Sequence, residues 1–146
     1  MVQIGSSNKD VRLLHPFQRT ENARDKTNEE SLVLQVCHLG CCVLFTGDIE
    51  EDAEKELLSK LAPIDILKVA HHGSKTSTSE RFVHLVKPKH SIISSGQGNR
   101  FNHPNISVLW NLRDSVIWRT DTHGTIVARI NSSGLQIESE TFVDKP

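Results

Sequence analysis

The sequence of 146 residues contains no Tyr, and only 5% of its residues are aromatic. Hydrophobic residues make up 36% of the chain, which is enough for the core of one domain of ordinary size. No run of about 18 apolar residues occurs, so the sequence predicts no membrane-spanning helix. The formal net charge is −1, so no overall basic field attracts a polyanion, and any contact with nucleic acid has to be local.

Cysteine is also scarce and confined to one segment. Cys37, Cys41 and Cys42 are an odd number at a spacing that does not predict a disulfide framework, so we expect reduced thiols. We expect them to pack as small hydrophobic side chains. A structural zinc site that adds His38 is the less favoured alternative, because Cys41 and Cys42 point to opposite faces of a strand.

The hydrophobic pattern predicts a mixed α/β sheet with helices on at least one face. Strands are expected at residues 11–14, 32–36, 41–45, 64–69, 91–93, 116–118 and 125–130, with an edge strand at 134–137. Helices are expected at 48–62, from about 79 to 87, and after 103–105, and residues 18–30 are expected to be a polar loop. The short connections at 38–40 and 121–124 predict two hairpins. We expect residues 1–130 to form the main unit and 131–146 to add the edge strand and a polar tail.

Two apolar strands of this pattern end in polar motifs. Thr46-Gly47-Asp48 follows one strand and His71-His72 follows the next. Because α/β folds place their sites at the carboxyl ends of strands, we expect Asp48, His71 and His72 to face one pocket as metal ligands. The alternatives are that Asp48 caps a helix and that the histidines belong to an ordinary loop.

The segment after the histidines carries small, hydroxyl and basic residues. Gly73 allows the backbone to approach a ligand closely, and Lys75 can meet the charge of a phosphate. We therefore expect Ser74, Lys75 and Ser77 to contact an anionic substrate.

A glycine-rich segment at 96–102 lies further along the chain. It contains Asn99 and Arg100, which we expect to close over the substrate, although a plain flexible connection is the alternative. His103 precedes Pro104, which restricts its backbone and fixes the side chain at the entrance of a helix. Asp121 and His123 form either a functional pair or a polar turn.

Together these segments resemble the metallo-β-lactamase domain of ComEC-type competence proteins, which are membrane channels for DNA uptake. The residues that carry the resemblance lie at 14–16, 28–34, 45–50, 53–54, 57–58, 65–77, 88–89, 94–96, 99, 103–104 and 119–124. The resemblance implies a sandwich of two sheets flanked by helices, with metals at one edge. It also implies two zinc or manganese ions, with Asp48 bridging them and either His71 or His72 as the last ligand.

The resemblance further implies metal-dependent hydrolysis of a phosphodiester, with DNA as the substrate and His72, His103 and Lys75 as catalytic residues. Full-length members of this family lie in the bacterial inner membrane. The non-catalytic alternative is a DNA-handling or interaction module. A phosphorylcholine-esterase-like hydrolase is a third reading, which the low aromatic content disfavours because choline binds in aromatic cages.

One motif of the superfamily is absent from the sequence. The cluster His-x-His-x-Asp-His does not occur, and a site needs three or four protein ligands. We therefore expect the chain to be the C-terminal half of such a domain, with the site completed by the N-terminal half and with metal binding reduced or absent without it. A half-sandwich leaves an apolar sheet face uncovered, so we expect the chain to form a homodimer.

Overall fold

The computed structural model describes residues 3–6, 9–16 and 28–140, and its centre is a mixed seven-stranded sheet. The strands follow one another in sequence order: β1 (Gln3–Ser6), β2 (Lys9–His15), β3 (Val33–His38), β4 (Cys41–Phe45), β5 (Ile66–Lys68), β6 (His90–Ile93) and β7 (Val116–Arg119). Neighbours are antiparallel from β1 to β4 and parallel from β4 to β7. The predicted mixed α/β sheet is confirmed, and β1 is a strand that the sequence pattern did not predict.

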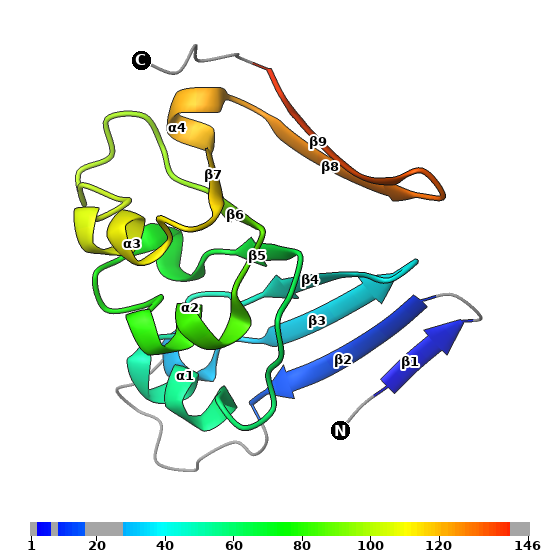
Figure 1. Cartoon of the computed structure of the whole chain (residues 1–146). Helices are drawn as coiled ribbons and strands as arrows, with labels where there is room; N and C mark the ends of the chain where they lie inside the picture. The colour runs from blue at the N-terminus through cyan, green and yellow to red at the C-terminus, as the bar shows by residue number, and fades with distance from the viewer. Residues whose placement is uncertain (1–2, 7–8, 17–27, 141–146) are drawn as a thin grey trace.

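Three helices connect the parallel strands. They are α1 (Glu51–Leu57), α2 (Glu80–Val86) and α3 (Ile106–Asn111), and Figure 1 shows them on one side of the sheet. Each crossover moves one strand further in the same direction, and right-handed connections therefore place all three helices on the same face. The N-caps of α2 and α3 are Ser79 and Asn105, whose side chains accept hydrogen bonds from backbone N–H groups of the first turn.

The first helix is shorter than predicted. It ends at Leu57, and the N–H of Lys60 donates to the carbonyl of Leu57 at 2.8 Å. Bonds of this i to i−3 type tighten the last turn and end the α-helix before Pro63 imposes its own restriction on the chain. The predicted extension to Ala62 is therefore wrong by about one turn.

The core fills the space between the helices and one face of the sheet. Its buried members include Val33, Leu44, Leu67, Val69, Ile93, Ile49, Leu57, Phe82, Val86, Val108 and Leu112. Side chains alternate across the strands, so Val43, Phe45 and Val116 lie on the opposite face, which we call the outer face. Phe45 and Val116 are 43% and 50% exposed, so this face is apolar but incompletely covered.

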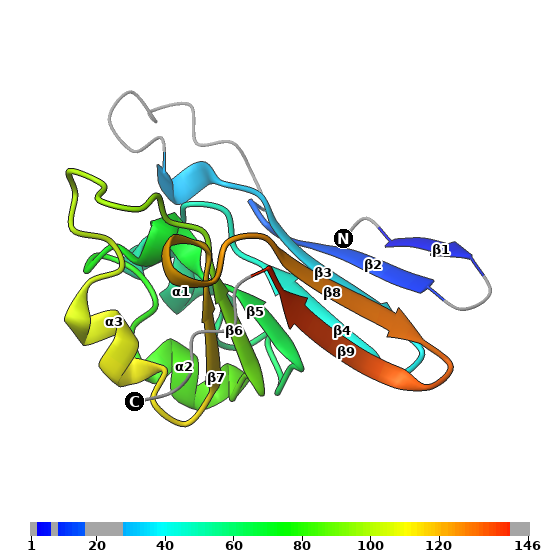
Figure 2. The same cartoon turned by 90° about the horizontal axis from the view of Figure 1, so that it is seen from above.

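The second sheet is a hairpin of β8 (Ile126–Asn131) and β9 (Gly134–Ser139). Figures 1 and 2 show it on the side of the large sheet away from the helices. The prediction that the strand at 125–130 pairs with the strand at 116–118 is wrong. A short helix, α4 (Thr120–His123), leads the chain out of the first sheet, because the Thr120 side chain accepts from Ser95 N at 2.9 Å and donates to Ser95 O at 2.8 Å. A strand does occur at the predicted position 134–137, as β9, but it pairs with β8 and not with the large sheet.

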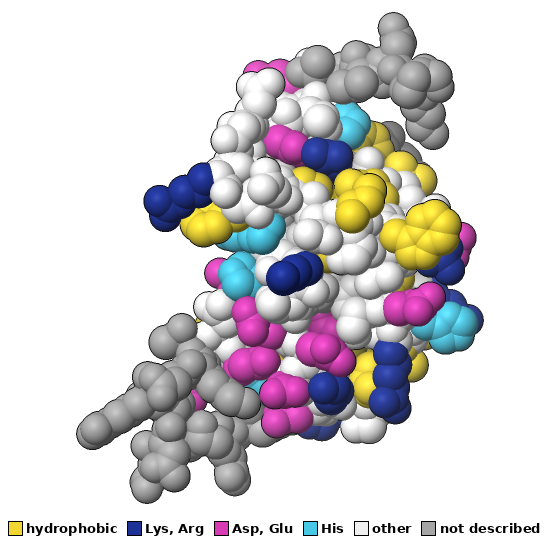
Figure 3. All heavy atoms as spheres, turned by 90° about the vertical axis from the view of Figure 1, so that its left-hand side faces the viewer, with side chains coloured by type: hydrophobic (Ala, Val, Ile, Leu, Met, Phe, Trp, Pro, Cys, Tyr) yellow, Lys and Arg dark blue, Asp and Glu magenta, His cyan; other side chains and the backbone are white. Residues whose placement is uncertain are grey.

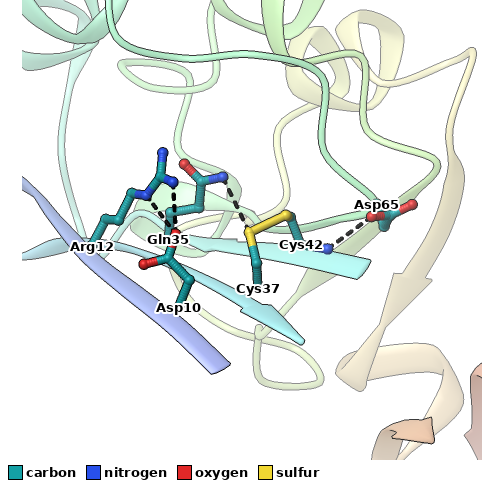
Figure 4. Close-up of a disulfide and its surroundings, with 6 residues drawn as sticks. All are labelled: Asp10, Arg12, Gln35, Cys37, Cys42 and Asp65. Atoms are coloured by element: carbon teal, nitrogen blue, oxygen red, sulfur yellow. Dashed lines mark hydrogen bonds and ion pairs between the residues drawn. A yellow bond between two sulfur atoms is a disulfide. The ribbon is translucent and has the colours of Figure 1, made fainter. Parts of the chain in front are cut away.

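The β3–β4 hairpin closes through Leu39 and Gly40, whose φ values of 49° and 78° suit a two-residue turn. The sequence places Cys37 and Cys42 symmetrically about this turn, so they are direct partners across the strands with a Cα–Cα distance of 4.1 Å. They form a disulfide (Figure 4). The expectation of reduced thiols is therefore wrong for this pair and correct for Cys41, which is buried and free.

The predicted loop at 18–30 lies largely outside the described residues. Its last three residues form a 3₁₀ helix, η1 (Asn28–Glu30). In the part of the chain that the structure describes, no helix has the length and hydrophobicity needed to cross a membrane.

Candidate active site

The chain leaves β5 through an unusual turn, η2 (Ala70–Gly73), that carries both histidines. His71, His72 and Gly73 have φ values of 45°, 55° and 83°, so three successive residues are left-handed. This region is sparsely populated by residues other than glycine and asparagine, and such strain persists only where the surroundings impose it. The N–H of His71 donates to the carbonyl of Gly47 at 3.1 Å, which ties this turn to the loop after β4. The two predicted motifs therefore do meet at one edge of the sheet.

A close contact brings the third histidine to this edge. A Cβ added to Gly73 would lie 2.6 Å from Pro104 Cβ, and the N–H of Asn105 donates to the carbonyl of Gly73 at 2.8 Å. The ring centroids of His71 and His103 are consequently 6.1 Å apart in an edge-to-face arrangement. Residues 32 positions apart in the sequence thus form one imidazole cluster, which we call the histidine cluster (His71, His72 and His103).

The environment favours a neutral ring for His103 in this cluster. Burial lowers the pKa of His103, and the nearby imidazoles of His71 and His72 lower that pKa further. The Nδ1 atom of His103 is buried without a hydrogen-bond partner, and Nδ1 of His71 lies 3.2 Å from Glu50 Oε1 without hydrogen-bond geometry. Neutral imidazole is the form that binds metal ions, so the cluster has ligand character.

His72 is held differently from its neighbour. Its Nδ1 atom lies 2.7 Å from the carbonyl oxygen of Ser94, and its side chain is otherwise exposed. A histidine that donates one ring N–H to a backbone carbonyl is fixed in orientation and keeps Nε2 available as a ligand. This arrangement orients Nε2 of His72 for a ligand.

Asp48 and Lys68 interact electrostatically beside the histidine turn. Burial lowers the pKa of the Lys68 ammonium, and the negative charge of Asp48 opposes that effect. Asp48 does not cap α1, since the N-cap residue is Glu50 and makes no side-chain capping bond. The helix-capping role is therefore excluded, and the Asp48 carboxylate remains a candidate metal ligand.

Glu50 is a site residue that the sequence analysis missed. Its Oε1 atom accepts from Thr76 Oγ1 at 3.0 Å and from Asn28 Nδ2 at 3.4 Å, besides lying near His71. Its carboxylate thus connects the end of β4 to the segment after the histidines. The only sequence signal was an acidic run after Gly47, which the first turn of a helix explained equally well.

Of the three residues after the histidines that we predicted to contact substrate, Ser74 and Ser77 are buried within the turn that carries the histidines. Ser74 and Ser77 are 6% and 3% exposed. The Ser77 hydroxyl donates to the carbonyls of Ala70 and Ser74, at 3.2 and 3.1 Å, so it supports the turn. Lys75 is exposed beside the cluster, where its ammonium is accessible to a ligand.

The segment at 96–102 is a loop whose backbone is held by hydrogen bonds from the side chain of Asn99. Asn99 Oδ1 accepts from the N–H groups of Phe101 and His103, and Asn99 Nδ2 donates to the carbonyls of Gly96 and His103. Arg100 is exposed, and its guanidinium lies 4.8 Å from the centroid of the Phe101 ring.

An open cavity of about 390 Å³ lies between this loop and the end of β6. It is lined by His72, Ser94, Ser95, Gly96, Asn99, Phe101, His103 and Thr120. Figure 3 shows histidine side chains at the surface. Acidic side chains lie below them in this view, and a basic side chain and hydrophobic side chains lie above them. Phe101 is a second residue that the sequence analysis missed, since a lone aromatic in a loop carries no distinctive pattern.

Asp121 and His123 do not form a functional pair. The Arg119 guanidinium binds Asp121 through two bonds of 3.1 and 2.6 Å, and His123 Nδ1 lies 3.0 Å from the Arg119 backbone. Burial raises the pKa of Asp121, but the Arg119 bonds outweigh it and the pKa is lowered overall. The polar-turn alternative is therefore the correct one.

The imidazole and carboxylate groups that the structure describes at this site are of the types that bind a divalent metal, but they are too few to complete a site. Imidazole nitrogens with buried, unpartnered atoms and a nearby carboxylate are the chemistry of such a site. Among residues 3–6, 9–16 and 28–140, however, no three His, Cys, Asp or Glu side chains are grouped so that they could hold an ion. The cysteine alternative fails as well, because Cys37 and Cys42 are joined in the disulfide.

Comparison with known proteins identifies the family. The model of the metallo-beta-lactamase superfamily matches residues 17–97. The chain belongs to this superfamily. Its members usually bind divalent metals. The two sheets, with helices on the face of the larger sheet that is turned away from the smaller one, agree with its fold.

Three relatives narrow the assignment. The chain is 45% identical to ComE operon protein 3 of Bacillus subtilis over 106 residues, or 70% of this chain and 14% of that protein. It is 38% identical to Recombination protein 2 of Haemophilus influenzae, over 76% of this chain and 14% of that protein. Competence protein ComA of Neisseria gonorrhoeae is 33% identical over 88% of this chain and 19% of that protein. These are ComEC-type competence proteins, so the resemblance is confirmed, and the chain spans less than a fifth of their length.

Proposed function

We propose that this chain is part of a metal-dependent phosphodiester hydrolase that acts on DNA in connection with its uptake. The observation that carries the proposal is the histidine cluster, in which a strained turn and a distant loop bring imidazoles together, and the N–H of His71 donates to the carbonyl of Gly47, the residue before Asp48. Membership of the superfamily supports a divalent metal, and the names of the relatives support a role in competence.

We assign the donors as follows. His72 offers Nε2, because its Nδ1 is engaged with Ser94 O, and Asp48 offers its carboxylate. His71 is the alternative imidazole ligand. Zinc or manganese, as a pair of ions, would activate a water and neutralise charge that develops on a phosphate. Lys75, exposed next to the cluster, would bind that phosphate by its charge.

The site needs further ligands for this activity. Because the described residues do not complete a coordination sphere, we propose that another part of the full-length protein supplies the missing ligands. The same part would cover the outer face, where Phe45 and Val116 are exposed. In its absence two copies of the chain cover this face by pairing, and a monomer in light scattering at tens of micromolar would contradict that pairing.

Metal binding by single-site variants tests the proposal. We expect Asp48→Ala and His72→Ala each to weaken zinc or manganese binding in titration calorimetry by about 10-fold or more, the effect typical of ligands and their supports. His84→Ala is the matched control, since His84 is an exposed histidine of α2 that does not line the cavity of the histidine cluster. Binding below about one tenth of an ion per chain by the full-length protein, with single-stranded DNA left intact, would leave only the non-catalytic module.

A further inference from the structure

An exposed aromatic ring adjoins the histidine cluster. Phe101 is 62% exposed, and its ring is stacked on His103 with centroids 5.7 Å apart and an angle of 18° between the planes. His103 in turn meets His71 edge-to-face. The three rings therefore form a continuous row from the surface to the candidate metal ligands.

The row is held in place by its loop. Asn99 binds the backbone on both sides of Phe101 through four hydrogen bonds, at distances between 2.6 and 3.2 Å. Burying a large apolar side chain is favourable, yet this one is fixed in an exposed position on a braced loop. A fixed, exposed aromatic ring at the mouth of a cavity is suited to stacking on a planar ligand.

The charges around the cavity limit how a polyanion can approach. Glu50 lies 3.2 Å from His71, the first turn of α1 exposes Glu51 and Asp52, and acidic side chains border the histidines on one side in Figure 3. At the cavity, whose lining includes Phe101, Arg100 places its guanidinium 4.8 Å from the Phe101 ring. A negatively charged strand is repelled from the acidic side and attracted to Arg100, so its path runs over Arg100 and Phe101.

We propose that Phe101 and the adjoining cavity bind one unpaired nucleobase next to the phosphate at the histidine cluster. The substrate class is therefore single-stranded nucleic acid, or a strand end that has separated from its partner. The open cavity of about 390 Å³ is lined by Phe101 and suits a single base, whereas a base that remains paired and stacked in a duplex cannot enter it. Arg100 pairs with a neighbouring phosphate. This inference rests on the proposed function for the identity of the phosphate, but the base subsite is tested without metal.

The test measures binding of fluorescein-labelled oligonucleotides by anisotropy in the presence of EDTA. The probes are a 12-nucleotide thymidine strand, an abasic strand of equal length and charge, and a duplex. We expect Phe101→Ala to weaken binding of the thymidine strand by about 10-fold, in the range of a lost base–aromatic stack, and Phe101→Trp to retain it. The abasic strand should bind the unchanged chain about 10-fold more weakly than the thymidine strand and should not respond to Phe101→Ala.

Trp110→Ala is the matched control. Trp110 is 68% exposed and lies 5.2 Å from the guanidinium of Arg113, so it forms a similar aromatic–arginine pair away from the cavity. Its removal should leave binding unchanged. Arg100→Gln should reduce the slope of log Kd against log salt by about 0.7, the value for one phosphate contact on a single strand.

Several results would overturn the proposal. For the variants, these results are that Phe101→Ala binds the thymidine strand as tightly as the unchanged chain does, or that the Phe101 and Trp110 variants lose equal affinity for it. For the probes, they are that the abasic strand or the duplex binds the unchanged chain as tightly as the thymidine strand does. The absence of any binding of the thymidine strand at about 100 µM would also overturn the proposal. Failure of the proposed function has a different signature. It would appear as absent metal binding by the full-length protein while the Phe101-dependent oligonucleotide binding persists.

Discussion

The two ends of the parallel strands β4 and β5 are built for different purposes. At the end where the strands begin, the Cys37–Cys42 disulfide joins the hairpin, and Asp65 accepts from Cys42 N at 2.8 Å (Figure 4). Asp65 also accepts from Lys89 Nζ at 2.7 Å. At the end where they finish, the backbone is left-handed through His71 and His72, and ring atoms lack partners. The first end satisfies its polar groups within the chain, whereas the second keeps groups available for a ligand.

Among the changes that test this difference between the two ends of the strands, Gly73→Ala should have the largest effect on stability. The added Cβ would lie 2.6 Å from Pro104 Cβ, at a residue whose φ is 83°, so both the contact and the backbone resist it. We expect a loss of about 3 kcal/mol in the free energy of unfolding, measured in urea, together with loss of metal binding. Gly98→Ala is the control, because its φ is 63° but nothing lies within 4 Å of an added Cβ. If the two variants cost the same, the Gly73–Pro104 contact does not position the histidine cluster.

Reduction of the Cys37–Cys42 disulfide should have an intermediate effect on stability. The cysteines are 5 residues apart, and the chain-entropy relation for so short a loop gives a loss of about 2 kcal/mol. Urea unfolding with and without reductant measures it, and the Cys37→Ser/Cys42→Ser variant should not respond to reductant. Metal binding should be unchanged, because the disulfide lies at the other end of the strands. A change in metal affinity on reduction would show that the two ends are coupled.

Asp65→Asn should have the smallest effect. Burial raises the pKa of Asp65, but the bonds from Lys89 and Cys42 outweigh it, so the pKa is lowered overall. A carboxyl with a lowered folded-state pKa stabilises the fold fully above its ordinary value of 3.8, and that contribution is lost as the pH falls toward the lowered value. We expect a cost of about 1 kcal/mol at neutral pH, since Lys89 is exposed and its ion pair is weak. The difference should shrink below pH 3.8, and a cost that does not depend on pH would contradict this account.

Much of the fold follows from local pattern. The strands at 41–45 and 91–93 and the helix after Ser79 are confirmed because apolar spacing, capping residues and proline act over a few residues. The pairing of β8 failed for the opposite reason. Whether the chain returns to the first sheet after β7 depends on the Thr120–Ser95 bonds, which join residues 25 positions apart.

The disulfide shows how a correct local rule can give a wrong result. The odd number of cysteines favoured reduced thiols. The alternation of side chains along a strand correctly predicted that Cys41 and Cys42 lie on opposite faces. The pairing of Cys37 with Cys42 depends on the register of the hairpin. That register follows from the two-residue turn at Leu39 and Gly40, which the sequence analysis read as a hairpin without using its symmetry.

By itself the sequence determined the family and the mixed sheet, since motifs such as Thr46-Gly47-Asp48 and His71-His72-Gly73 are contiguous along the chain. The tertiary structure alone decided which of those residues face one another. His103 joins the cluster because Pro104 packs on Gly73, and Glu50 approaches His71 because Thr76 holds its carboxylate. Such contacts depend on the packing of loops that are distant in sequence, and no short pattern encodes their geometry.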